Sequence, residues 1–599
     1  MVSTPDCVDV RKPCVTIASA FQFFKPSPSE AVGIVKRMPP LRQSRGSFHF
    51  LLAVAVSTAL ALAFLGSRAA AQQPIAGKSD IELGPYLFGW VVPENFTQGS
   101  LEEMAARKDP LRLFVVAFRG LVEYRRDALE DRLAASTRIL DFMLEKYEPA
   151  VRGDNGIRWY YGNDHGAIKA PWWSGMDAMM GPMTFYAAYE LTGNQRYRDE
   201  AVKSAKLVLT SPSDGGILWN ENGKCWLSEY SWTGIQPSEE YHVLNGHLWA
   251  LQSLLLLAKA TGDAKLQSAY DCARDGVVAQ EDRFYRANGT WTNYQTTPLE
   301  LNPVHYNTLE HIQYLAMHAL SGDRAYLQPA KARADIFAAA YPLSLIGKEG
   351  SMEVIFSMIG PPHPYWTDTY PVRVSCQVDG QTIERRNNNL YKTSVPLSER
   401  LIIKVPVGSR PTSCAVSVHT PLTIPMYERT EFSVEAAEAQ PLPLDGATAM
   451  LDAASIEAGK VQITPGHVEV DGANSANDEA RIVLPLGIPV SDHDIIAFVV
   501  KTPQKMDLGF LMEDSEGRQA TRYYLPLAAG KENIVMLNRL GFEKNDELGD
   551  TLRSIAMRIF TDPAGDDYEI VISDFQKLRS PAQISRWLEG HPNANFPQQ

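Results

Sequence analysis

Hydrophobic positions between residues 100 and 340 recur at helical spacing, and the helices that they predict come in pairs. Three apolar helices end in Thr or Ser followed by Gly, and Asn or Asp then begins the next helix: residues 191–194, 260–263 and 320–323. Glycine suits the left-handed residue that ends a helix, and Asn or Asp caps the helix that follows. The second helices are predicted at 197–209, 264–279 and 324–340. An earlier predicted pair, 101–122 and 127–148, ends at Pro149.

The connections between these pairs are of two kinds. Tight turns join the helices within a pair, whereas long irregular inserts separate the pairs, at residues 152–175, 211–242 and 282–305. This arrangement predicts an α/α barrel over residues 100–342, with an inner and an outer ring of helices. The long inserts are expected to share one face of the barrel, and binding residues concentrate on such loops.

The pattern changes near residue 345, where short runs of alternating apolar and polar residues replace the helical spacing. These runs predict a β-sandwich module over 345–436 and a second sandwich or jelly-roll-like module over 437–580. Residues 581–599 are interpreted as a C-terminal tail. The predicted fold class is therefore a multidomain α plus β protein. A structural role and a sugar-binding role for the β modules both stay open.

The N-terminal part contains an apolar run at residues 50–66, with Arg42 and Arg45 before it and three alanines at 69–71 after it. This order is typical of a secretory signal, so we expect export to the periplasm or the outside of the cell. An uncleaved membrane anchor is the alternative, because about 17 apolar residues are near the lower limit for a span. Residues 1–37 do not fit ahead of a signal, which favours a start at Met38. Residues 72–99 are a lead-in.

The net charge of −13 becomes more negative once residues 1–71 are removed, because that segment is basic. Nucleic-acid or anionic-membrane partners are therefore not expected. Cys376 and Cys414 lie in strand-like runs and are predicted to form a disulfide, whereas Cys225 and Cys272 are expected to be separate thiols. Zinc motifs and glycine-rich cofactor motifs are not evident, so neither a metal nor a cofactor is predicted. The sequence leaves open whether the protein forms a homo-oligomer.

Three stretches, residues 171–176, 226–246 and 291–311, mix aromatic, amide and carboxylate side chains at the edges of apolar helices. In these stretches, and over about residues 155–340, the chain resembles the C-terminal domain of the D-glucuronyl C5-epimerases. The motifs that carry the resemblance are Trp172-Trp173-Ser174-Gly175-Met176, Trp226-Leu227-Ser228-Glu229-Tyr230, Val243-Leu244-Asn245-Gly246, Trp291-Thr292-Asn293-Tyr294, and Tyr306 followed by His311-Ile312-Gln313.

The resemblance implies an isomerase on an α/α barrel that converts D-glucuronic to L-iduronic acid within an acidic polysaccharide, as a heparosan-N-sulfate-glucuronate 5-epimerase does. The family's catalytic residues fall on Glu229, Tyr230, Tyr294 and Tyr306. The sequence departs from the family in four places: a longer span from 230 to 243, methionines at 179 and 180 in place of polar residues, a histidine at 311 one position farther from the tyrosine at 306, and β regions that the animal enzymes lack. The longer span contains a second Glu-Tyr pair, Glu240-Tyr241, which competes for the catalytic role.

Epimerisation at C5 removes a weakly acidic proton next to a carboxylate, so an acid and a base are needed on opposite faces of the sugar. Tyr294 and Tyr306 come from separate segments and are predicted to flank one sugar ring. A protonated Glu229 would donate a hydrogen bond to the substrate carboxylate, and Arg158, Lys169 and His311 are candidate cations. The candidate substrate-binding residues are Trp172, Trp173, Ser174, Met176, Trp226, Glu240, Tyr241, Asn245, His311 and Arg158.

Other interpretations compete with these assignments. Trp172 and Trp173 would either stack on sugars or close the barrel, and Asn245 with Gly246 would serve the start of a helix. A polysaccharide lyase would use the same proton abstraction but expel the C4 substituent, giving an unsaturated product. A glycoside hydrolase on the same barrel would need two carboxylates beside the scissile bond and would release new reducing ends.

Overall fold

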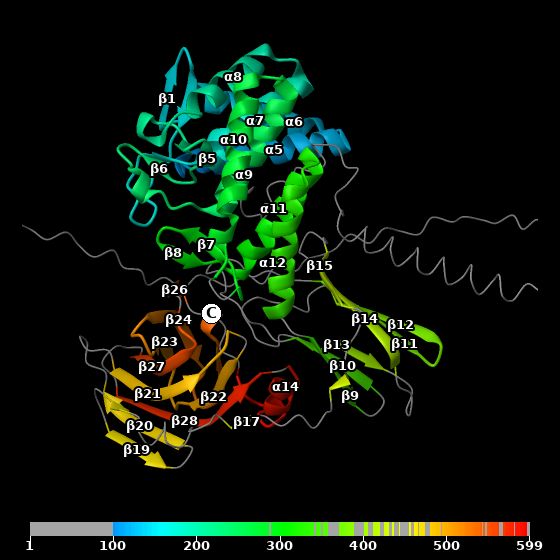
Figure 1. The fold of residues 1–599 in the computed structure, drawn as a ribbon. Helices are drawn as coiled ribbons and strands as arrows, with labels where there is room; N and C mark the ends of the chain where they lie inside the picture. The colour runs from blue at the N-terminus through cyan, green and yellow to red at the C-terminus, as the bar shows by residue number, and fades with distance from the viewer. Residues whose placement is uncertain are drawn as a thin grey trace, which may run out of the picture. The chain divides into compact units, whose positions relative to one another are not determined.

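The computed structural model describes residues 100–595, apart from short stretches within that range (Figure 1). The stretches left out are 287–288, 341–342, 349–350, 357–370, 388–400, 405–410, 420–424, 430–433, 436–441, 444–454, 457–459, 465–466, 474–479, 493, 542, 546–547, 562–566 and 580. The predicted signal segment, the proposed start at Met38 and the lead-in therefore lie outside the described residues. None of the described helices is long and apolar enough to cross a membrane.

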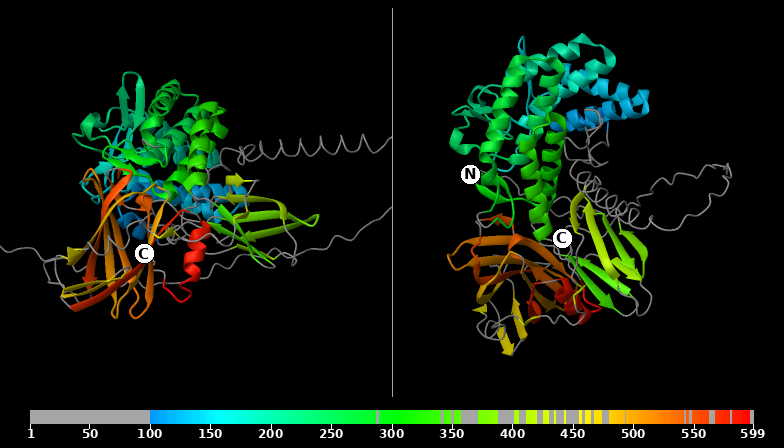
Figure 2. Two further views of the ribbon diagram at one scale, coloured as in Figure 1. Left: turned by 60° about the horizontal axis from the view of Figure 1, so that its bottom comes forward. Right: turned by 45° about the vertical axis from the view of Figure 1, so that its right-hand side comes forward.

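The N-terminal half of the described chain consists of four helical hairpins. After the short helix α4 (Leu101–Ala106), the hairpins are α5 (Pro110–Asp127) with α6 (Glu130–Glu145), α7 (Gly175–Thr192) with α8 (Gln195–Val208), α9 (Leu244–Thr261) with α10 (Ala264–Gln280), and α11 (Val304–Ser321) with α12 (Leu327–Ala340). The first helices of the hairpins pack on one another in the order α5, α7, α9, α11, as the colours from blue to green show in Figures 1 and 2. This is the layering expected of an inner and an outer ring. Extended packing of α11 on α5, which would close a ring, is not seen among the described helices.

The caps predicted from the recurring motif are confirmed. Gly193, Gly262 and Gly322 each end a helix in the left-handed region, with φ of 71°, 64° and 73°. The residue after each glycine accepts hydrogen bonds from the backbone of the next helical segment. The boundaries at 197–209, 264–279 and 324–340 agree with the structure to within a few residues, although the last begins with the 3-10 turn η4 (Arg324–Tyr326).

The predicted helix at 101–122 is wrong, because two helices occupy this region. Asp109 separates α4 from α5, with an extended backbone and a side chain that accepts the amide of Arg112 at 3.1 Å. Pro110 follows at the first helical position. A proline disfavours the helical conformation in the residue before it, so a continuous helix through Asp109 is not expected. The second predicted helix is present as α6 and is slightly shorter at both ends.

The β elements of the helical half are short and lie in the inserts between hairpins: β1 (Ala150–Gly153), β2 (Gly156–Trp159), β3 (Trp172–Trp173), β4 (Leu218–Glu221), β5 (Lys224–Leu227), β6 (Ser231–Trp232), β7 (Asn293–Thr296) and β8 (Leu299–Leu301). The 3-10 turns in the same inserts are η1 (Pro212–Asp214), η2 (Pro237–Glu239) and η3 (Glu281–Phe284). One continuous hydrophobic core joins the helices to β2 and β5.

The next module has two four-stranded sheets. One has the order β13 (Leu401–Lys404), β10 (Ser351–Phe356), β9 (Leu343–Lys348), β16 (Val434–Glu435), and the other has the order β12 (Gln381–Asn387), β11 (Val372–Val378), β14 (Pro411–His419), β15 (Pro425–Arg429). The predicted disulfide between Cys376 and Cys414 is confirmed. The two cysteines are directly opposite each other on the antiparallel strands β11 and β14, which brings their side chains together.

The last module has two six-stranded sheets, and the small strand β17 (Leu442–Pro443), which pairs with β28 (Asp567–Leu578), is the sixth strand of the first. Their orders are β19 (Lys460–Thr464), β20 (His467–Ala473), β28, β22 (Ile495–Lys501), β25 (Glu532–Leu537), and β18 (Ser455–Ile456), β21 (Ala480–Pro489), β27 (Thr551–Thr561), β23 (Met506–Asp514), β24 (Gln519–Leu527), β26 (Glu543–Asn545). Apolar side chains from both sheets form one core, which is the packing of a β-sandwich.

Residues 581–589, which we expected to be part of a tail, form the helix α14 (Pro581–Glu589). Its Ile584 and Trp587 pack on Ile495, Ala497 and Val499 of β22. The alternate residues of the same strand face the sandwich core. Strand β22 is therefore buried on both faces, which explains its uninterrupted apolar sequence.

Candidate active site

The three long inserts of the helical half meet, as the sequence predicts. The first two are joined by the pairing of β3 with β6, in which Trp172 is opposite Trp232. The second and third are joined by the amides of Thr296 and Thr297, which donate to the carbonyl of Tyr241 at 3.1 and 3.2 Å. Segments that are 60 and 55 residues apart in the sequence are thus held together by backbone hydrogen bonds.

Three tyrosines lie together where the inserts meet. The hydroxyls of Tyr230 and Tyr294 are 3.3 Å apart and hydrogen-bonded, and the ring of Tyr294 stacks on that of Tyr306 with centroids 5.2 Å apart. Tyr230 follows β5, Tyr294 lies on β7 and Tyr306 lies in the first turn of α11. All three are partly exposed. The sequence motifs therefore converge on one partly exposed cluster.

The stacking of Tyr294 on Tyr306 leaves no room for a sugar between the two rings, so the predicted flanking of one sugar ring by this pair requires the rings to separate. Two flat groups in contact are separated by roughly 3.5–4.0 Å, so a sugar between the rings would need about twice that distance. The centroids are only 5.2 Å apart and the rings are tilted by 16°. The reason is that β7 and the start of α11 are joined by the short hairpin strand β8, which returns the chain to the same side of the cluster.

Glu229 is buried beside this cluster, with 3% of its surface exposed. Its Oε2 makes no hydrogen bond among the described residues, and it lies so close to Gly246 that a Cβ there would be 1.9 Å away. On the other side, the amide of Gly175 donates to the carbonyl of Ser228 at 2.8 Å. The segment 228–230 is thus held between the first turns of α7 and α9, and glycine at both contacts makes the close approach feasible.

Burial raises the pKa of Glu229 to about 7, the charge of Glu240 adds to the shift, and the Tyr230 hydroxyl only partly offsets it. The phenol pKa values of Tyr230, Tyr294 and Tyr306 are raised by burial as well, and the charge of Glu229 raises each of them further. All three phenols are therefore protonated at neutral pH. A phenolate base at this site needs a compensating cation or hydrogen-bond donor.

The competing pair, Glu240 and Tyr241, has a different environment. Both Trp219 Nε1 and Ser228 Oγ donate to Glu240 Oε2, at 2.6 and 2.5 Å, and the amide of His242 donates to Oε1 at 3.2 Å. Burial nevertheless raises the pKa of Glu240 to about 7. The hydrogen bond from Ser228 Oγ means that Glu240 supports the 228–230 segment. Because its oxygens already accept three hydrogen bonds, Glu240 has little capacity left to bind a substrate.

A family model described as D-glucuronyl C5-epimerase C-terminus matches residues 152–334. This span contains all three tyrosines, both Glu-Tyr pairs and the three inserts that bring them together. Residues 152–334 are similar to the C-terminal domain of this family and are here called the C5-epimerase domain. The C5-epimerase domain therefore includes the last three helical hairpins up to the middle of α12, whereas α5, α6 and both β modules lie outside the match.

Other comparisons find weaker similarities. An uncharacterized protein of Methanocaldococcus jannaschii, MJ1128, is 27% identical over 151 residues, which are 24% of this chain and 46% of that protein. The chain thus matches about half the length of this curated relative. A cellobiose 2-epimerase from Bacillus thermoamylovorans is 16% identical with a TM-score of 0.29, covering 41% of this chain and 63% of that one. A GH76 α-mannanase from Bacteroides thetaiotaomicron is 14% identical with a TM-score of 0.27, covering 39% and 56%. At these scores we draw no argument from the solved structures.

The candidate tryptophans Trp172, Trp173 and Trp226 are buried rather than exposed as flat surfaces for sugar stacking. Trp172 stacks on Tyr161 with centroids 3.9 Å apart, and Trp173 donates its Nε1 to the carbonyl of Gly216 at 2.7 Å. Trp226 lies in the core, with its ring stacked on His247 at 4.0 Å. Their present contacts favour the structural interpretation, in which they hold the inserts against the helices.

Several other candidate residues of the C5-epimerase domain have defined structural contacts. Ser174 caps α7 by accepting the amide of Met176, whose side chain is partly exposed. The carbonyl of Asn245 accepts Gln313 Nε2 at 3.0 Å, which ties α9 to α11. These contacts position the first turns of α7 and α9, between which the segment 228–230 is held.

The candidate cations do not meet the tyrosines in the described contacts. Arg158 has its guanidinium against Gly215, and Lys169 pairs with Asp164 at 2.7 Å. His311 Nδ1 lies 2.8 Å from the carbonyl of Ala330, between α11 and α12. A residue that sequence reasoning missed is His165, whose ring stacks on Tyr230 with centroids 5.2 Å apart. Its position in the 152–175 insert, next to Tyr161, was the available signal.

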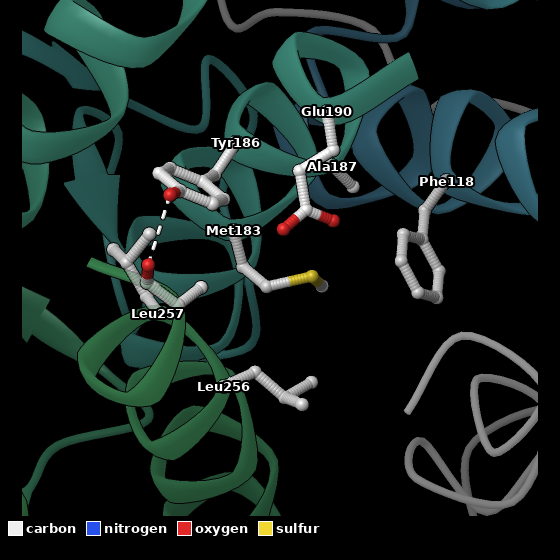
Figure 3. A pocket seen from close by; sticks show the side chains of 8 residues that line it. Phe118, Met183, Tyr186, Ala187, Glu190, Leu256 and Leu257 are labelled. Atoms are coloured by element: carbon white, nitrogen blue, oxygen red, sulfur yellow. Dashed lines mark hydrogen bonds between the residues drawn. The ribbon is translucent and has the colours of Figure 1, made fainter. Parts of the chain in front are cut away.

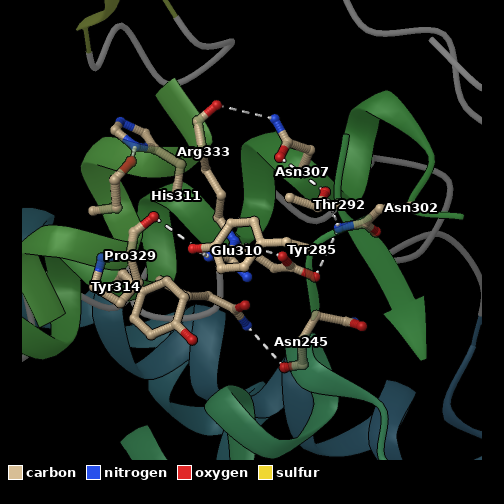
Figure 4. A network of polar contacts seen from close by, with 12 residues as sticks. Asn245, Tyr285, Thr292, Asn302, Asn307, Glu310, His311, Tyr314, Pro329 and Arg333 are labelled. Carbon is tan, nitrogen blue, oxygen red and sulfur yellow. Dashed lines mark hydrogen bonds and ion pairs between the residues drawn. The ribbon is translucent and has the colours of Figure 1, made fainter. Parts of the chain in front are cut away.

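A buried polar network supports the segments that carry Tyr294 and Tyr306 (Figure 4). The guanidinium of Arg333 bonds to Glu310 Oε2 at 2.7 Å and to Glu281 Oε1 at 2.6 Å. Asn302 Nδ2 donates to Glu310 Oε1 at 2.9 Å and to Thr292 Oγ1 at 3.2 Å. Burial opposes ionisation of Arg333, but the charges of Glu281 and Glu310 outweigh it and raise its pKa. The network ties α12 to the β7–β8 hairpin and to α11.

The expectation that Cys225 and Cys272 are separate thiols is wrong, because they form a disulfide. Helix α10 packs directly on β5: a Cβ at Gly276 would lie 1.8 Å from the carbonyl of Cys225. Cys272, one turn earlier on the same face of α10, therefore meets Cys225. The bond anchors β5 immediately before the segment that carries Glu229.

A separate open pocket of roughly 460 Å³ lies toward the other ends of α7 and α9 (Figure 3). Its lining residues are Phe118, Met183, Tyr186, Ala187, Glu190, Leu256, Leu257 and Ala260. The pocket is mostly apolar and contains none of the candidate catalytic residues. Among the described residues, no group of three or more His, Cys, Asp or Glu side chains is arranged to hold a metal ion.

Proposed function

We propose that this protein is a uronyl C5-epimerase that acts on a glucuronic-acid-containing polysaccharide, and that its helices close an α/α barrel. The observation that carries the proposal is the hydrogen-bonded pair of Tyr230 and Tyr294 hydroxyls, 3.3 Å apart, beside Glu229 in the family-matched domain. The match itself supports the coarser statement that this is a carbohydrate-modifying epimerase.

In the free site one tyrosine first loses its proton to solvent, and the hydrogen bond that the other hydroxyl donates favours this ionisation. The reaction then breaks the C5–H bond and passes the C5 proton to this phenolate, while the electron pair moves into the neighbouring carboxyl group. A second tyrosine then gives its hydroxyl proton to C5 from the opposite face, and the electron pair returns to that new bond. One tyrosine ends protonated and the other ionised, so the pair exchanges roles between the two directions. A positioned acid or base of this kind contributes about 10²- to 10⁴-fold to the rate.

Tyr230 and Tyr294 fit this pair better than Tyr294 and Tyr306 do. The first two come from different inserts and meet only through their hydroxyls, whereas the last two stack face to face. A carbon with a reacting oxygen on each side needs roughly 6–7 Å between those oxygens. Substrate entry therefore requires the two hydroxyls to separate, with Tyr306 moving together with Tyr294 as its packed neighbour.

Glu229 takes the role of the group that neutralises the substrate carboxylate. With its pKa raised to about 7, it is substantially protonated at neutral pH and is able to donate a hydrogen bond. Neutralising the carboxylate makes the C5 proton more acidic, because negative charge that develops on abstraction is stabilised. We do not give this role to Glu240, because its carboxyl group already accepts three hydrogen bonds.

The test is incubation of the protein with glucuronate polymers in deuterium oxide, followed by NMR at C5. We expect deuterium to enter at C5 and iduronate signals to appear, with no change in chain length. An unsaturated product absorbing in the ultraviolet would instead identify a lyase, and new reducing ends would identify a hydrolase. Absence of exchange with every uronate polymer tested would overturn the proposal.

The remaining assignments follow as parts of the same proposal. The partner is an acidic polysaccharide, and no nucleic acid or cofactor takes part. The protein is exported through the segment 42–71, with cleavage near Ala71, and an uncleaved anchor remains the alternative. Fractionation of the native host tests this, because a full-length chain in the soluble cytoplasm would contradict export.

A further inference from the structure

Basic side chains are scarce in the two segments that carry the three tyrosines. In residues 226–242 and 282–306, the arginines are Arg283 and Arg286, and lysine does not occur. Arg286 is buried, with 5% of its surface exposed, whereas Arg283 is exposed. An enzyme for an acidic polymer needs a cation near its site, so the surroundings of Arg283 are informative.

Both hydrogen-bond partners of the Arg283 guanidinium are neutral oxygens. Nη1 donates to Gln280 Oε1 at 2.6 Å and Nη2 donates to Thr296 Oγ1 at 3.1 Å. The carbonyl of the same residue accepts Asn293 Nδ2 at 3.3 Å, which ties η3 to the start of β7. Neutral acceptors orient the guanidinium without cancelling its charge, and the remaining N–H groups stay available to an anion.

The partner Thr296 places this charge on the same face as Tyr294. In β7 the burial alternates, with Asn293 and Gln295 buried and with Tyr294 and Thr296 partly exposed. The register of β7 against β8 shifts between Asn293 and Gln295, so the shared side of Tyr294 and Thr296 rests on their partial exposure rather than on regular alternation. Residues two positions apart on a strand are about 7 Å apart along it. That spacing is comparable to the length of one sugar unit, so an anionic group on the bound polymer lies within reach of Arg283.

We propose that Arg283, oriented by Thr296 and Gln280, forms a subsite for a carboxylate or sulfate group of the polysaccharide bound beside Tyr294. The subsite sets affinity for the acidic chain, and the tyrosines and Glu229 perform the chemistry. This inference rests on the proposed function for the identity of the polymer, but it concerns binding alone. The two described hydrogen bonds leave three N–H groups of the planar guanidinium, which can pair with either anion in a bidentate way.

The experiment measures binding in the Tyr294→Phe background, so that turnover does not enter the result. Calorimetric titration with a non-sulfated and with an N-sulfated glucuronate polymer compares Arg283→Gln with Arg196→Gln, an equal change of charge on α8, where Arg196 pairs with Glu145. We expect Arg283→Gln to weaken binding of at least one of the two polymers about ten-fold or more, since hydrogen bonds to charged groups are the strong ones. Arg196→Gln leaves binding unchanged. Thr296→Val retains the charge and weakens binding by less than Arg283→Gln does.

Two ligands identify the anion. If the carboxylate is recognised, carboxyl-reduced polymer binds equally to Arg283→Gln and to the protein with Arg283. If sulfate is recognised, the difference between the two proteins appears only with N-sulfated polymer. Equal binding of every polymer by Arg283→Gln and Arg196→Gln would overturn the inference. Loss of C5 exchange in the native protein, with the binding difference intact, would instead refute the epimerase proposal and leave the subsite standing.

Discussion

The two Glu-Tyr pairs of this chain have the same residue types but different surroundings. Glu229 lies against the backbone of Gly246 with one oxygen unbonded, and its neighbour Tyr230 contacts the Tyr294 hydroxyl. Glu240 accepts three hydrogen bonds, and the ring of Tyr241 packs on Tyr230. We infer from this difference that the second pair supports the first, because both carboxyl oxygens of Glu240 accept hydrogen bonds, whereas Oε2 of Glu229 has no hydrogen-bond partner among the described residues.

The largest difference in kcat is expected between variants of the tyrosines of the two pairs. Tyr230→Phe and Tyr294→Phe retain the ring but remove the only ionisable group, so kcat should fall about 10²- to 10⁴-fold. Tyr241→Phe should change kcat less than ten-fold, and each folded protein should lose at most roughly 1 kcal/mol of stability. Deuterium entry at C5, measured separately from D- and L-uronyl polymers, checks the rates in both directions. Normal exchange in both Tyr230→Phe and Tyr294→Phe would show that the site is misplaced.

Replacement of each glutamate by glutamine separates chemistry from support. Glu229→Gln should lower kcat about ten- to one-hundred-fold with little loss of stability, because the acid proton is removed from an unbonded position. Glu240→Gln puts an amide group among the donors of Trp219 and Ser228, so it should destabilise the fold by roughly 1–3 kcal/mol. Chemical denaturation and steady-state rates on the same samples check both. The reverse pattern would make Glu240 the catalytic acid.

Gly246→Ala tests whether the position of Glu229 depends on close contact with α9. The added Cβ would lie 1.9 Å from Glu229 Oε2, so the carboxyl group must move, at a cost of roughly 1–3 kcal/mol. We expect a loss of activity together with this loss of stability. Gly153→Ala is the matched control, since nothing lies within 4 Å of a Cβ there. Unchanged activity in Gly246→Ala would remove Glu229 from the mechanism.

The smallest expected effect is a shift in pH dependence. With its pKa raised to about 7, Glu229 loses its proton as pH rises through that value, and activity should fall on this alkaline side. Because the folded pKa lies above the ordinary value of 4.5, the folded state binds more protons than the unfolded state between these values. Stability should therefore decrease as pH rises from about 4.5 to about 7.

Glu240 enters this titration through its charge, which raises the pKa of Glu229. In Glu240→Gln that contribution is lost, and the alkaline limb of the kcat profile should move to lower pH. Profiles of kcat against pH for the two proteins check the shift. If the alkaline limb of the kcat profile stays in place in Glu240→Gln, the two carboxyl groups do not interact. If the alkaline limb disappears in Glu240→Gln, the group that titrates is Glu240 itself.

Much of the helical half could be predicted from local patterns. The Gly-Asn and Gly-Asp junctions predicted the ends of three helices because capping depends on residues adjacent in the sequence. The break between α4 and α5 is local as well, because Pro110 disfavours a helical conformation at Asp109. The clustering of the three inserts followed from hairpin alternation, and the resemblance supplied the tyrosines.

Contacts between distant segments required the tertiary structure. The sequence by itself determined which segments carry the aromatic and acidic side chains, because helical periodicity and turn residues act over a few positions. Only the tertiary structure decided that Tyr294 stacks on Tyr306, that Cys225 bonds to Cys272, and that Glu240 is fully hydrogen-bonded. Each of these depends on the packing of elements that are connected through long inserts. The glycines at 246 and 276 allow those elements to approach closely. The distance of approach depends on the volume of the side chains that meet there, and not on the spacing of residues along the chain.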